Sequence, residues 1–136
     1  MLDSLHARFH HLGVACRDLD RERAGWLALG YQEEGAVFLD PRQKIRGQFL
    51  TGPGPRIELV TPHGDGSPVD GYLARGTKIY HQAYECPDLE AALAILSAAG
   101  AKITAAPAPA VAFEGRDIAF VMLPNLNLIE LIEAPE

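Results

Sequence analysis

Two stretches of this chain repeat each other at a fixed distance. The stretch that begins at His11 reads HLGVACRDLDRERAGWLALG, and the one that begins at His81 reads HQAYECPDLEAALAILSAAG. The identical pairs, each 70 residues apart, are His11/His81, Cys16/Cys86, Asp18/Asp88, Leu19/Leu89 and Gly30/Gly100. A second echo, 72 residues apart, joins IELV at 57–60 and IELI at 129–132. Such matches could arise by chance among common residues. Five identities at one offset, followed by a similar motif at the end of each copy, favour a duplicated module instead.

Both copies predict the same order of elements. A strand at 9–15 or 78–85 leads to an Asp suited to cap a helix, and a Gly is placed to end that helix. Three extended stretches follow each helix, near 31–39, 45–51 and 56–61 and near 102–105, 117–123 and 128–133. We therefore predict an α+β fold with two βαβββ modules related by a pseudo-twofold. They would form a cupped mixed sheet with the helices outside.

The boundaries of the modules follow from the turn residues between them. We predict a single domain over 1–136, with module one at about 6–62 and module two at about 78–134. A linker helix is expected at about 63–77, because Ser67-Pro68 is a typical helix start and Gly76 a typical end. The Ala/Pro-rich stretch 105–112 is expected to be an irregular or polyproline-like edge, since proline cannot donate to a strand ladder.

Composition excludes several classes of function. The net charge of the 136 residues is 12 − 18 = −6, which argues against a nucleic-acid partner. Apolar runs are too short for a membrane span, and the stretch MLDSLHARFHH lacks the apolar region of a signal peptide. Cys16 and Cys86 show no metal-binding or disulfide spacing. We expect a cytoplasmic protein with reduced thiols and no membrane partner.

Strand alternation indicates which repeated residues share a face. If Leu12 and Val14 pack on the module's helix, His11 points to the opposite face of the sheet. The same argument turns Glu58 and Glu130 away from the helices, because each lies between two apolar residues. Both faces of the strand around His81 carry polar and apolar residues, so alternation does not assign a face to His81. Its equivalence to His11 in the repeat assigns it to the same face as His11. Each module thus offers one His and one Glu.

These four residues, His11, Glu58, His81 and Glu130, form a predicted metal site. Imidazole nitrogens and carboxylate oxygens bind divalent ions such as Zn, Ni, Co, Fe or Mn, and one ion per site is expected. A carboxylate within an apolar strand is costly unless something neutralises it. Taken singly, each residue has an ordinary alternative, a hydrogen-bonded core His or a solvated Glu. The symmetric set of four favours the metal.

At this point the chain resembles a known family. The motifs HHLGVACRDLD, RIELVTP, KIYHQAYECPDLEAAL, RDIAFVMLP and LIELIE are similar to those of the vicinal oxygen chelate superfamily, which includes glyoxalases, bleomycin-resistance proteins and dioxygenases. Within it they are most similar to methylmalonyl-CoA epimerases and glyoxalase I-like proteins. The resemblance spans about 9–134. It implies paired βαβββ modules, usually in a homodimer, with a divalent ion held by residues that fall on His11, Glu58, His81 and Glu130.

One position departs from the epimerase pattern. The epimerases carry a catalytic Glu in a turn that matches Asp40-Pro41-Arg42-Gln43-Lys44 here, so Arg42 stands where the acid is expected. Arginine stays protonated and does not serve as an ordinary base. Alternation suggests that Ile45 and Phe49 face the helix. Substrate binding is assigned to the opposite side, to Arg42, Arg46 and Gln48, which would hold an anionic group; an exposed basic strand end is the alternative.

Together these observations predict a metal-dependent lyase or isomerase of the glyoxalase or methylmalonyl-CoA epimerase type. A proton would leave the carbon next to a metal-bound carbonyl, by way of an enediolate or enolate, with Glu130 or Glu58 as the catalytic base. The substrate is expected to be a small carbonyl compound or thioester with an anionic group. The alternative of another class is a non-catalytic antibiotic-binding protein of the same fold. An Fe²⁺ dioxygenase, with two His and one carboxylate, is a third reading.

Overall fold

The computed structural model describes residues 2–136, and its contacts divide the chain into two compact units. The first unit is His11–Tyr80, and the second joins the residues through His10 to His81–Glu136. Among the described residues, no helix is both long enough and apolar enough to cross a membrane.

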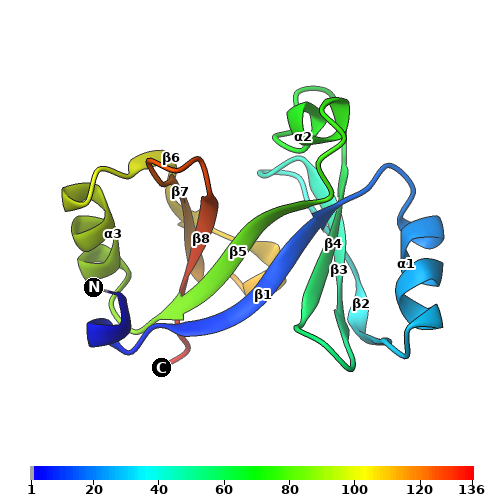
Figure 1. Cartoon of the computed structure of the whole chain (residues 1–136), viewed down its shortest axis with the longest axis horizontal. Coiled ribbons are helices and arrows are strands. Elements are labelled where there is room, and N and C mark those ends of the chain that lie inside the picture. The colour runs from blue at the N-terminus through cyan, green and yellow to red at the C-terminus, as the bar shows by residue number, and fades with distance from the viewer. Residues whose placement is uncertain (1) are drawn as a thin grey trace. The chain divides into compact units, whose positions relative to one another are not determined.

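The first unit carries one copy of the predicted module. Its elements are β1 (Arg8–Ala15), α1 (Leu19–Ala28), β2 (Gln32–Asp40), β3 (Ile45–Thr51), β4 (Ile57–Pro62) and α2 (Asp70–Ala74). The strands are ordered β2-β3-β4-β1; β1 and β4 run parallel, and the other neighbours run antiparallel. Figure 1 shows α1 alongside these strands, and it contacts β4. The predicted βαβββ order is confirmed here.

The second unit repeats this arrangement. Its elements are η1 (Leu2–Leu5), β5 (Ile79–Cys86), α3 (Leu89–Ala98), β6 (Lys102–Pro109), η2 (Val111–Phe113), β7 (Asp117–Met122) and β8 (Leu128–Glu133). The strands are ordered β5-β8-β7-β6, with β5 and β8 parallel. In Figure 1, α3 lies beside the N-terminal turn η1, and it also contacts β6 and β8. The duplication predicted from the sequence is therefore present in the fold.

The repeated Asp and Gly residues have the predicted roles. Asp18 caps α1 by accepting a hydrogen bond from the backbone N–H of Arg21 at 3.1 Å, and Asp88 caps α3 in the same way through Ala91 at 3.0 Å. The φ of Gly30 is 101° and that of Gly100 is 97°, a region that favours glycine. Each helix therefore begins and ends at equivalent positions of the two copies.

Each unit has an apolar core under its own helix. In the first unit it consists of Val14, Cys16, Leu19, Tyr31, Leu50, Ile57 and Leu59. In the second it consists of Cys86, Leu89, Ala92, Leu93, Leu96, Ala119, Val121, Ile129 and Leu131. Ile57 and Leu59 of β4, and Ile129 and Leu131 of β8, thus face the helices, which leaves the Glu between each pair for the other face.

Two predicted segments differ from the structure. The stretch at 105–112 is not irregular throughout, because β6 continues to Pro109. Its prolines are tolerated since β6 ends the strand order and has one neighbour, β7. The linker helix is also shorter than the predicted 63–77 and covers Asp70–Ala74 alone. Ser67 does not cap it, because its hydroxyl accepts a bond from the N–H of Val69 in the preceding turn.

A close contact at Gly47 gives the first testable prediction. A Cβ at Gly47 would lie 2.7 Å from the ring of Phe38 and 2.8 Å from the carbonyl oxygen of Leu59. Gly47→Ala is therefore expected to lower the free energy of unfolding by about 1–3 kcal/mol, as overpacking does. Urea denaturation measures this change.

Gly25 offers the matched control for that substitution. It lies within α1, and nothing stands within 4 Å of its ideal Cβ. Gly25→Ala is expected to raise the free energy of unfolding by about 0.5–1 kcal/mol, because alanine has the higher helix propensity. Equal effects of the two substitutions would contradict the role assigned to the contact at Gly47.

Candidate metal centre

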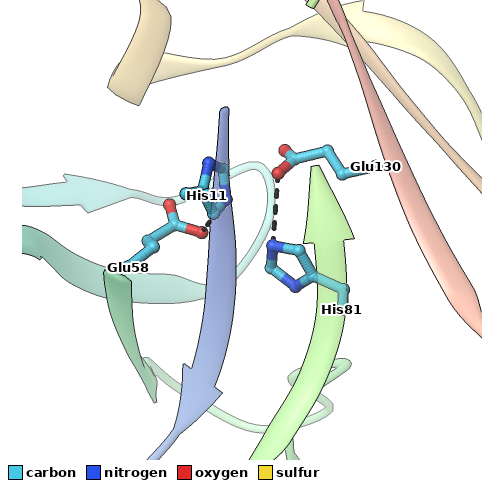
Figure 2. A group of neighbouring side chains, drawn as sticks. All are labelled: His11, Glu58, His81 and Glu130. Carbon is cyan, nitrogen blue, oxygen red and sulfur yellow. Dashed lines mark ion pairs between the residues drawn. The ribbon is translucent and has the colours of Figure 1, made fainter. Parts of the chain in front are cut away.

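The first unit contains a buried His–Glu pair. His11 on β1 and Glu58 on β4 are 0% and 4% exposed, and His11 Nε2 lies 3.2 Å from Glu58 Oε1. In the parallel register Glu58 stands opposite Gly13, two residues after His11, so both side chains occupy the same face of the sheet. Figure 2 shows the carboxylate of Glu58 pointing toward the imidazole of His11.

The second unit contains an equivalent pair. His81 on β5 and Glu130 on β8 are each 3% exposed, and His81 Nε2 lies 3.3 Å from Glu130 Oε1. Glu130 stands opposite Ala83, again two residues after the His and again a small residue. Figure 2 shows both pairs, with dashed lines between the imidazole and the carboxylate of each. The two units thus build the same arrangement from the same parts of the repeat.

A phenylalanine completes each arrangement. Phe49 on β3 stands opposite Glu58, and its ring meets His11 edge to face with 5.1 Å between centroids. Phe120 on β7 stands opposite Glu130 and meets His81 in the same way at 5.5 Å. Sequence reasoning placed Phe49 on the helix side and did not consider Phe120. The signal was available, because these two residues are 71 apart, between the offsets of the His and Glu pairs.

The donor atoms fit a divalent cation. Each pair supplies one imidazole nitrogen and one carboxylate oxygen, the ligand types that Zn²⁺ and the neighbouring transition metals accept in proteins. Burial of a carboxylate without a counter-charge is costly, and a bound cation would remove that cost for both glutamates. The rings of Phe49 and Phe120 add apolar surface beside the pairs, which raises that cost. The residues are therefore compatible with a metal site.

The predicted face of β3 is wrong. Phe49 lies on the face with His11, whereas Gln48 accepts a hydrogen bond from Arg23 of α1 at 2.7 Å and donates to Glu33 at 3.0 Å. Gln48 is thus on the helix side, and Arg46, two residues away on the same strand, shares that side and is exposed. The assumption that apolar residues face the helix fails here because the opposite face is itself lined by rings.

Arg42 lies elsewhere in the first unit. It is exposed in the turn between β2 and β3, where the carboxylate of Asp40 accepts bonds from the backbone and side chain of Gln43. Asp40 is 1% exposed and Gln43 is half-buried, whereas Arg42 is exposed. Its guanidinium is available to an anion.

The two cysteines do not contribute donor atoms. Both are free and buried, one in each core. Burial raises the pKa of the Cys16 thiol to about 11 and that of the Cys86 thiol to about 11. Both thiols are protonated at neutral pH and are poor metal ligands and nucleophiles.

Comparisons with known proteins agree with this geometry. The profile of the Glyoxalase/Bleomycin resistance protein/Dioxygenase superfamily matches residues 10–120. The chain is 32% identical to an ethylmalonyl-CoA/methylmalonyl-CoA epimerase of Cereibacter sphaeroides, over 91% of this chain and 96% of the relative.

Solved structures are similar as well. A methylmalonyl-CoA epimerase from Mycobacterium tuberculosis superposes with a TM-score of 0.79 at 29% identity, over 94% of this chain and 89% of that chain. A variant of the Streptomyces coelicolor enzyme, in complex with 2-nitronate-propionyl-CoA, gives 0.77 at 26% identity, over 95% and 98%. The epimerases are isomerases, and the similarity covers nearly the whole chain.

Proposed function

Because the chain belongs to the glyoxalase/bleomycin resistance protein/dioxygenase superfamily, we propose that it is a divalent-metal-dependent isomerase that epimerises an acyl-CoA thioester. The substrate class comes from the relatives, which are named for methylmalonyl-CoA and ethylmalonyl-CoA. The reacting carbon of such a substrate lies between a thioester carbonyl and a carboxylate, so its proton is acidic enough for a carboxylate base. The homodimer and the cytoplasmic location stay predictions from the sequence.

The single observation that carries the proposal is the repeated buried pair. His11 with Glu58 in one unit, and His81 with Glu130 in the other, each bring one imidazole nitrogen and one carboxylate oxygen together among buried side chains. We propose that both pairs bind one cation together, since each pair alone supplies two ligands and catalytic zinc sites typically have three protein ligands. The bound ion would polarise the thioester carbonyl and stabilise the charge that develops when the proton leaves.

The two glutamates carry the proton transfer in this proposal. A carboxylate has two oxygens, so one can serve the cation while the other exchanges a proton. Glu130 takes the proton from the reacting carbon, and Glu58, which comes from the other module, is the second acid/base group. Phe49 and Phe120 exclude water from the two pairs and so prevent competing protonation.

Arg42 is proposed to bind an anionic part of the substrate. A guanidinium binds a carboxylate or a phosphate in a bidentate fashion, and a malonyl-type CoA thioester carries both groups. The same residue favours a second candidate function. Because Arg42 occupies the place where the epimerases carry an acid, a one-base isomerase or lyase of the glyoxalase type would also fit this chain. Glu58 is the residue that decides between them.

Deuterium exchange tests the proposed function. With either epimer of methylmalonyl-CoA in D₂O, the purified protein loaded with Co²⁺ is expected to form the opposite epimer with one deuterium on the reacting carbon. Nuclear magnetic resonance follows the exchange, and a stereospecific coupled assay follows the inversion. Exchange without inversion would select the one-base reading. The absence of both, with tight binding of a small molecule, would select the non-catalytic binding protein.

A further inference from the structure

An aromatic pair lies on the metal-ligand face of the first unit. Phe49 meets His11, and the ring of Phe38 lies next to Phe49 with 6.0 Å between centroids and an interplanar angle of 35°. Both rings are half-buried, so part of each remains accessible. We propose that Phe38 and Phe49 form a wall that limits the size of the alkyl branch on the reacting carbon. This inference rests on the proposed function.

The position of the wall is fixed by the backbone. Phe38 projects from β2 over Gly47 of β3, where a Cβ would lie 2.7 Å from the tip of its ring. Phe38 also packs against the core formed by Ala15, Ile45, Val60 and Val69. The ring therefore rests on a strand without a side chain at that point. It cannot move further toward the sheet, so the space in front of it is set by the ring itself.

The second unit has no equivalent of this pair within its described residues. The pair of positions Phe38 and Gly47 corresponds, through the repeat, to Ala108 and Ile118, which are also opposite each other. In the second unit the larger side chain, Ile118, is on the inner strand β7, and the edge strand β6 carries only the methyl group of Ala108. Phe49 gains its second ring from Phe38, at the position opposite Gly47, whereas Ala108 stands at the equivalent position beside Phe120. A two-ring wall is a property of the first unit.

The chemistry of the wall matches a short aliphatic group. A thioester bound through its carbonyl beside His11 would bring the substituents of the adjacent carbon against Phe49. Ring carbons reject the carboxylate, which needs hydrogen bonds, and accept the alkyl branch. One additional methylene in a pocket of fixed shape changes specificity by roughly 10–200-fold. The wall is therefore expected to discriminate a methyl branch from an ethyl branch.

Phe38 is the residue to change, because its ring packs on Phe49 and on the core beneath it rather than on the His–Glu pair itself. Phe38→Leu is expected to raise the ratio of kcat/KM for ethylmalonyl-CoA to that for methylmalonyl-CoA by about tenfold. Phe38→Val is the second variant, for the case in which the leucine side chain of the first fills the space that the ring leaves. Leu39→Ala is the control, since Leu39 is exposed and projects from the next position of β2, on the opposite face.

The outcomes separate the two proposals. A wild-type protein that turns over neither thioester would refute the proposed function, and the wall with it. Turnover of both, with a ratio that stays within twofold in Phe38→Leu and Phe38→Val, would overturn the wall alone. A ratio that rises in both Phe38 variants and stays constant in Leu39→Ala supports the wall. An equal rise in Leu39→Ala would also overturn it, because the change would then not depend on the face.

Discussion

Glu130→Gln is expected to slow epimerisation of methylmalonyl-CoA by about 10²–10⁴-fold, the range that a positioned acid/base group contributes. The amide keeps the shape of the side chain and an oxygen that can serve a cation, but it cannot take a proton. Glu130 is 3% exposed on β8, so an isosteric replacement leaves the packing of Phe120 and His81 in place. Stopped-time assays of deuterium incorporation and of inversion measure the loss.

Two further variants complete this test. Glu90→Gln is the control, because Glu90 is exposed in the first turn of α3, and its rate is expected to equal that of the wild type. Glu58→Gln is expected to lose inversion more than it loses exchange, if Glu58 is the second acid/base group. A rate within threefold of the wild type in Glu130→Gln, with unchanged circular dichroism, would exclude Glu130 as the base.

The repeat predicted more of this molecule than any single motif. It gave the βαβββ order twice, and it identified His81 although the alternation around that residue was ambiguous. The structure shows why the equivalence of the two copies was the better guide. In each copy a buried Glu lies opposite the residue two positions after the His. Equivalent positions keep the same strand register even where neighbouring side chains have diverged.

Alternation alone failed on β3. It sorts the residues of a strand into two faces but does not say which face packs against the helix. The polarity of the side chains was used to choose that face. Phe49 was assigned to the helix side because it is apolar, yet it faces His11. The polar Gln48 is instead buried beside α1, where it accepts a hydrogen bond from Arg23. The pairing of Phe49 with Glu58 decides the face, and that register depends on the turn between the strands, which the sequence did not determine.

His11→Ala and His81→Ala are each expected to weaken metal binding enough that the ion is lost on dialysis, if one cation is shared by both pairs. The wild-type protein is then expected to bind one divalent ion per chain, measured by elemental analysis after dialysis against Co²⁺ and removal of free metal. Each variant removes one of four ligands, and the affinity is expected to fall by at least about tenfold. His63→Ala is the control, because His63 is exposed in the segment after β4.

The number of ions separates three readings of the buried pairs. A shared cation gives one ion per chain, and either His variant loses it. Independent sites would give two ions in the wild type and one in each variant. Protonated histidines paired with the glutamates would give none, and the melting temperature would then not respond to metal or to a chelator. Under the shared site, binding stabilises the fold by about 1.4 kcal/mol for each tenfold excess of metal over Kd. Co²⁺ is therefore expected to raise the melting temperature of the wild type and of His63→Ala. It is not expected to raise that of His11→Ala or His81→Ala.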